Sequence, residues 1–121
     1  MPFTDASMIL LRKLATYLPD EEDSGATEFV PGYVRGAIRR FEIGGRVTLT
    51  PEMLWFRAHP INSAPGTRFG IPVEEITRLD DVSSGLRKKV RVTMRSGMAP
   101  TFLMWGIPRF IDAVERARAA L

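Results

Sequence analysis

The sequence predicts a mainly β domain: a bent sheet or barrel of six or seven short strands, capped by a C-terminal α-helix and preceded by an extra N-terminal helix. Three observations support this. Glycine, proline, serine and asparagine interrupt residues 42–105 every few positions, which is typical of short strands joined by tight turns. Between the interruptions apolar and polar residues alternate, and near residue 107 the apolar residues change to helical spacing.

Residues 5–18 are predicted to form the extra helix. Asp5 can cap its start, Pro19 ends it, and apolar residues recur at helical spacing, at Met8, Leu11 and Leu18 among others. The acidic run over 20–23 then predicts a flexible linker. We therefore divide the chain into an N-terminal helix and linker over 1–27 and a domain over 28–121.

The strands of the domain follow from alternation and from the turns between them. The clearest pair is a hairpin of 46–50 with 53–58, preceded by a tight turn over 42–45. The proline in 68–72 places that strand at an edge or a bend, and 73–76 is predicted to form a corner. The remaining extended segments are 28–30, 33–41, 77–82, 88–95 and 99–105, with a loop at 59–67 and turns at 83–85 and 96–97.

The C-terminal helix is predicted from one apolar face. Pro108 suits its first turn. The apolar residues at helical spacing are Ile107, Phe110, Ile111, Val114, Ala117 and Leu121. That face must be buried, and an open end of the barrel is the simplest place for it.

Composition limits the classes of function. The 121 residues suit one domain. The absence of cysteine excludes disulfides and thiol nucleophiles, and no apolar run approaches the length of about 20 that crosses a bilayer. We expect a cytoplasmic protein, with a peripheral place at the membrane as an alternative. Residues 1–30 hold six acidic and two basic residues, whereas 31–121 hold eight and fifteen, so the basic body favours anionic partners.

Four short motifs occur in a fixed order along residues 30–121. The first is Gly45 to Thr50, a turn, and Leu54-Trp55-Phe56; the second is the Ile-Pro-x-x-x-Ile corner over 71–76. The third is the basic strand over 90–94 with its glycine turn and Phe102, and the fourth is the closing helix. In this order the motifs resemble the GRAM and bacterial pleckstrin-homology-like families.

The resemblance implies a bent seven-stranded sheet with a C-terminal helix closing one end. It also implies a binding role, with phosphoinositides or other anionic lipids as ligands in some members and protein partners in others. Lipid-binding members place basic residues around the loop that joins the first two strands. Here Arg35, Arg39, Arg40 and Arg46 bracket 42–45, so we take Arg39, Arg40 and Arg46 as candidate site residues.

The densest basic cluster is a second candidate site for an anion or a partner. It consists of Arg87, Lys88, Lys89, Arg91 and Arg95. On a strand, Lys89, Arg91 and Arg95 share one side and can contact phosphates. The alternative is a solvated outer face that prevents edge-to-edge aggregation. Trp55 and Trp105 have two readings as well, as interface aromatics or as core residues.

Catalysis has little support in the sequence. His59 is the single histidine and lies in a predicted loop, and the carboxylate pairs Glu74-Glu75 and Asp80-Asp81 point to opposite faces if they lie on strands. We predict no catalytic residue, no metal site and no cofactor.

The sequence therefore predicts a non-enzymatic binding or adaptor module that recognises a protein partner or an anionic lipid surface. The alternative is a homo-oligomeric scaffold, such as a homodimer, that uses the helix over 5–18 as its interface. Nucleic-acid binding ranks lower, because no strand that combines aromatic and basic residues and no helix-turn-helix is visible.

Overall fold

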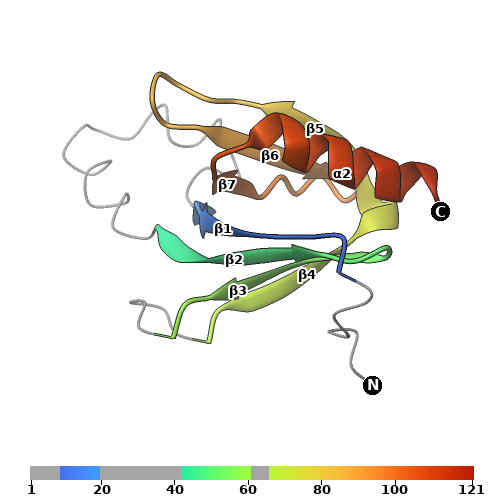
Figure 1. The fold of residues 1–121 in the computed structure, drawn as a ribbon, viewed down its shortest axis with the longest axis horizontal. Helices are drawn as coiled ribbons and strands as arrows, with labels where there is room; N and C mark the ends of the chain where they lie inside the picture. Colours follow the sequence, from blue (N-terminus) through green and yellow to red (C-terminus); the bar gives the residue numbers. More distant parts are fainter. Residues whose placement is uncertain (1–8, 20–41, 61–65) are drawn as a thin grey trace.

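A computed structural model of the protein describes residues 9–19, 42–60 and 66–121 (Figure 1). Its strands form one antiparallel sheet in the order β4-β3-β2-β1-β7-β6-β5. The strands are β1 (Leu11–Tyr17), β2 (Ile43–Leu49), β3 (Met53–Ala58), β4 (Arg68–Pro72), β5 (Ile76–Asp81), β6 (Lys89–Met94) and β7 (Thr101–Leu103). A 3-10 turn, η5 (Val73–Glu75), joins β4 to β5, and α2 (Ile107–Ala119) ends the fold.

The core lies between the inner face of the sheet and α2. Alternate residues of every strand point inward, and α2 adds Ile107, Phe110, Val114 and Ala117, all of which are buried. α2 contacts η5 and β5, and in Figure 1 it lies on the β5–β7 side of the molecule, with β1 between it and β3. The predicted seven-stranded sheet with a closing C-terminal helix is confirmed.

Four aromatic rings fill the centre of this core. Tyr17, Phe56, Phe69 and Phe102 come from four different strands, and their ring centroids lie 4.9–6.2 Å apart. Phe56 and Phe102 are fully buried. Edge-on and offset contacts at these distances add to the burial of apolar surface, so the cluster ties the two halves of the sheet together.

The N-terminal prediction is wrong where the structure tests it. Residues 11–17 are a strand, not a helix, because β1 pairs with β2 over its whole length and with β7 at Thr16 and Tyr17. Residues 5–8 lie outside the described ranges. The predicted domain boundary at residues 27 and 28 also falls outside them, in 20–41, but the strand that precedes it belongs to the sheet.

The predicted tight turn over 42–45 is also wrong, because Ile43, Gly44 and Gly45 lie inside β2. Gly45 is needed there for close approach between strands. A Cβ added to it would lie 2.2 Å from the Arg57 carbonyl oxygen. The turn between the first two strands therefore does not occur at 42–45; the segment that joins β1 to β2 is 18–42.

Most other local predictions hold. The β2–β3 hairpin is confirmed, and its turn is closed by the Thr50 N–H, which donates to the Met53 carbonyl at 2.8 Å. β4 is an edge strand, and η5 forms the predicted corner. The last strand is shorter than predicted, since β7 covers Thr101–Leu103 alone. The strands expected at 28–30 and 33–41 fall outside the described residues.

α2 begins as its sequence predicts, but it ends at Ala119, so the prediction that Leu121 lies on its buried face is wrong: Leu121 follows the helix and is 63% exposed. Gly106 precedes it with φ 71°, a left-handed conformation that suits glycine, and Pro108 lies in the first turn. Arg116 and Arg118 lie in the last turn, where they interact favourably with the helix dipole. Across residues 9–19, 42–60 and 66–121, no helix is both long and apolar enough to cross a membrane.

Candidate anion-binding site

Three arginines lie side by side on the outer face of β2, β3 and β4. Arg46 on β2 is directly opposite Arg57 on β3, and Arg57 is directly opposite Arg68 on β4. All three are exposed. We call them the arginine row. On the other side of Arg46, the facing residue of β1 is Leu14.

The local sequence explains why these side chains point outward. In β2 the inward residues are Ile43, Gly45, Val47 and Leu49, and in β3 they are Leu54, Phe56 and Ala58. Because neighbouring side chains of a strand alternate between faces, Arg46 and Arg57 lie on the side away from the core.

The arginine row has no acidic neighbour in the described part of the chain. The ion pairs there join Arg78 with Asp80, Arg87 with Glu42, Arg116 with Asp112, and Arg118 with Glu115. None of these pairs includes a member of the row, or Arg12 on the outer face of β1. This face therefore carries a concentrated positive charge that no described carboxylate pairs with, and like charges directly opposite on neighbouring strands are destabilising.

The arginine row lines a groove of about 690 Å³, here called the arginine groove. Its other charged or aromatic lining residues are Arg12, Trp55, Phe56 and His59. Beside the arginine row, a second set of facing residues also points outward. In it Arg12 of β1 faces Thr48 of β2, Thr48 faces Trp55 of β3, and Trp55 faces Gly70 of β4. The groove therefore combines four guanidinium groups with an aromatic ring.

The absence of a side chain at Gly70 leaves the space that the Trp55 ring occupies. A Cβ on Gly70 would lie 2.7 Å from Trp55 Cζ3, so the indole ring lies across the backbone of β4 where a side chain would otherwise stand. The ring is half-buried. The sequence-based alternatives for Trp55 are thus resolved in favour of the outer face.

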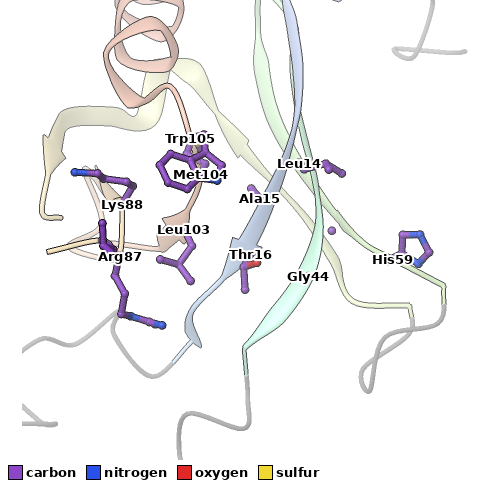
Figure 2. Close-up of a pocket in the computed structure, with 12 residues that line it drawn as sticks. Leu14, Ala15, Thr16, Gly44, His59, Arg87, Lys88, Leu103, Met104 and Trp105 are labelled. Carbon is purple, nitrogen blue, oxygen red and sulfur yellow. The ribbon is translucent and has the colours of Figure 1, made fainter. Parts of the chain in front are cut away.

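A second hollow of about 540 Å³, here called the apolar hollow, adjoins the arginine groove. Figure 2 shows Arg87 and Lys88 on one side of it, Leu14 and His59 on the other, and Leu103, Met104 and Trp105 between them. Leu14 and His59 line both cavities. Trp105 is 73% exposed, and Leu86, in the turn before β6, is 89% exposed.

The residues of the predicted basic cluster do not form one group in the structure. Arg87 binds Glu42, with 3.0 Å between Nη2 and Oε2. Lys89 and Arg91 share the outer face of β6 as predicted. Arg95 lies beyond the far end of β6, where its Nη2 donates to the Glu74 carbonyl at 2.9 Å. Lys88 is exposed in the segment that leads into β6.

Of the residues predicted from the family resemblance, Arg46 lies in the arginine row, and Arg39 and Arg40 lie outside the described ranges. Sequence reasoning missed Arg12, Arg57 and Arg68. Each occupies a polar position of an alternating strand, which is the one signal that pointed to it. Their convergence depends on strand order and register.

Among the described residues, two groups have shifted pKa values, and both lie outside the groove. Burial, and then repulsion from Arg109, lowers the pKa of Lys13, whose Nζ lies 3.5 Å from the Gly106 carbonyl oxygen. Hydrogen bonds from the side chain and backbone of Ser83 lower the pKa of Asp81. Within the described ranges, no group of three His, Cys, Asp or Glu side chains is placed to hold a metal ion.

Comparison with known proteins supports the fold. Among solved structures, the chain is similar to the C-terminal domain of an unknown protein from Leishmania infantum, with a TM-score of 0.60 and 13% identity over 96% of this chain and 89% of that one. It also matches the Vps36 N-terminal PH domain, with a TM-score of 0.48 and 17% identity over 63% of this chain and 62% of that one.

A scan against models of protein families finds no match, and a search of curated proteins finds none. The comparisons therefore show the fold alone, a seven-stranded sheet with a C-terminal helix, and the pleckstrin-homology-like assignment stays a prediction. The narrower GRAM assignment stays a prediction as well.

Proposed function

We propose that the protein is a non-enzymatic binding module that holds an anionic partner on the outer face of β1 to β4. The arginine row carries this proposal. Three guanidinium groups from adjacent strands converge on one groove, and none has a carboxylate partner among the residues that the structure describes.

An anionic ligand relieves the repulsion within the arginine row. A guanidinium presents a planar fork of N–H donors that matches phosphate and carboxylate oxygens, often with two hydrogen bonds to one group. Because the three arginines are exposed, the interaction should weaken as the salt concentration rises. The arrangement suits the binding of an anionic group, since four guanidinium groups line one groove.

Titration with long-chain inorganic polyphosphate tests the proposal, because this probe carries neither bases nor lipid. Arg57→Gln should weaken binding about tenfold, the loss expected for one charged hydrogen bond. It should also reduce the slope of log K against log salt by about 1. Arg109→Gln, on the exposed side of α2, removes the same charge elsewhere and is the matched control. Equal losses in the two variants would refute a role for the arginine row.

A second candidate function is docking on an anionic lipid surface, and the apolar hollow favours it. Leu86 projects from the turn before β6, followed by Arg87 and Lys88, and Trp105 is exposed beside it. Exposed apolar and aromatic side chains next to basic residues suit the membrane interface. In co-sedimentation with anionic vesicles, Leu86→Ser should reduce the bound fraction, whereas Leu121→Ser, which changes another exposed leucine away from the hollow, should not. No enrichment of the wild type at low salt would eliminate this candidate.

The scaffold alternative loses its structural basis over residues 11–17. β1 is an inner strand with β2 on one side and β7 on the other, so a dimer formed by a helix there is excluded. Self-association through other surfaces stays a prediction that light scattering can test.

A further inference from the structure

We infer that the anionic ligand of the arginine groove is single-stranded nucleic acid, with its phosphates on the arginine row and a base on Trp55. This inference rests on the proposed function and names its ligand class. It starts from one strand: β3 places Trp55 and Arg57 on its outer face at successive outward positions. A strand that combines aromatic and basic residues was not visible in the sequence, because Trp55 alternates with buried Leu54 and Phe56.

The shape of the arginine row fits a chain of phosphates better than a single phosphate. Neighbouring strands are about 4.8 Å apart, so the row extends about 10 Å from Arg46 to Arg68. Over this length each guanidinium of the row can contact a different phosphate of one strand. A ligand with repeated charges satisfies them in sequence.

Trp55 distinguishes nucleic acid from other polyanions. Every base has a π-face, and bases that stack on aromatic side chains in a positively charged groove are the usual basis of single-strand binding. An acidic peptide gains less from an indole ring.

The same geometry favours single strands over duplexes. Bases in a duplex are stacked on one another and do not offer their faces to a protein ring. Readout of a duplex usually requires a helix or a two-stranded ribbon that enters the major groove. The outer face of β1 to β4 presents side chains of a continuous sheet to the ligand, and no helix projects from it in the described part of the chain.

Fluorescence anisotropy with two labelled probes tests the inference. One is an oligothymidylate of about 10 nucleotides, within the usual site size for one domain. The other is an abasic strand of equal length, which has the same phosphates and no bases. The wild type should bind the first about 5- to 10-fold more tightly, the lower part of the range for one stacked base, because Trp55 is half-buried.

Variants separate the two parts of the site. Trp55→Leu should abolish the preference for the strand with bases and leave the affinity for the abasic strand unchanged, whereas Trp105→Leu, an exposed tryptophan outside the groove, should keep the preference. Gly70→Ala provides a second route, because its Cβ would displace the indole ring without removing it. Arg57→Gln should weaken binding of both strands alike.

The possible outcomes are distinguishable. If the wild type binds both strands equally, or prefers a duplex or anionic vesicles to the oligothymidylate, the inference is overturned while the proposed function stands. If the wild type binds neither strand nor polyphosphate, the proposed function fails as well. A preference for bases that survives both Trp55→Leu and Gly70→Ala, in variants whose circular dichroism matches the wild type, also overturns the inference.

Discussion

Gly45→Ala should be one of the most damaging single-methyl additions to this fold. The new Cβ would lie 2.2 Å from the Arg57 carbonyl oxygen and 2.9 Å from the Ala58 Cα. Ordinary contact begins near 3.4 Å, so β3 must move away from β2 by about 1 Å. Both blocking atoms belong to the backbone, and no rotamer change can relieve the clash.

The expected loss follows from three terms. Overpacking of this kind costs about 1–3 kcal/mol. Moving β3 also weakens the hydrogen bond from the His59 N–H to the Gly44 carbonyl, 2.9 Å long, which adds about 1 kcal/mol. Compared with glycine, alanine lowers the conformational entropy of the unfolded chain, which stabilises the folded state by about 0.4–1 kcal/mol. The net expectation is a free energy of unfolding lowered by about 1–4 kcal/mol, or a Tm lowered by roughly 4–15 °C.

Urea denaturation followed by far-ultraviolet circular dichroism measures this loss. Gly70→Ala is the matched control, because its Cβ would meet the ends of the Met53 and Trp55 side chains, which can move. We expect that variant to lose less than about 1 kcal/mol. If Gly45→Ala is as stable as Gly70→Ala at equal m-values, the close approach of β2 and β3 is not what requires glycine.

Three further changes test the core and the two shifted pKa values. Phe102→Ala should lower the free energy of unfolding by about 3–5 kcal/mol in urea denaturation, because its ring is fully buried; a loss below about 1 kcal/mol would contradict its place in the core. Lys13→Met should raise the urea midpoint at pH 7, because burial and Arg109 disfavour the folded ammonium. The wild type should recover this difference as pH rises toward 10.5, where the unfolded state binds more protons than the folded one, so a gain independent of pH would argue against the lowered pKa. Asp81→Asn should lower the midpoint at pH 7, because the ionised carboxylate accepts the Ser83 hydrogen bonds. That deficit should shrink as pH falls below 3.8 and through the lowered pKa of the folded state, and a deficit that persists at lower pH would have another cause.

Local patterns were sufficient for the elements whose signals are local. The β2–β3 hairpin has a turn of two residues between alternating segments, and α2 has one apolar face with a glycine and a proline at its start. In both, neighbours in sequence are neighbours in space. The edge position of β4 followed from Pro72, which lacks the N–H that an inner strand donates.

β1 was not predictable in the same way. Its apolar residues fit a helical stripe through Leu11, Ala15 and Leu18, yet the folded strand buries Ala15 and leaves Leu14 67% exposed. What makes this segment a strand is pairing with β2 and β7, which are distant in sequence. Such pairing overrides local propensity.

The candidate site escaped prediction for a related reason. Arg12, Arg46, Arg57 and Arg68 look like ordinary polar positions of separate strands, and the basic run near residue 88 is far denser in the sequence. The register of the strands has the opposite effect on which basic residues lie close together. It aligns three arginines that are eleven residues apart in sequence, while the dense run is divided between two ends of β6 and an ion pair with Glu42.

The arginine row is also the part of the fold that packing does not require. The inner residues beside it, Val47 and Phe56, bury the apolar surface that stabilises β2 and β3, so the outward positions are free to vary without loss of core contacts. Threonine or an alternation of lysine and glutamate would suit these positions better for stability, since like charges across strands oppose pairing. Three arginines at facing positions therefore lower stability in the isolated domain. A ligand that supplies the missing negative charge turns the same repulsion into binding energy, and this is the physical reason to seek the function on the outer face rather than at the end that α2 closes.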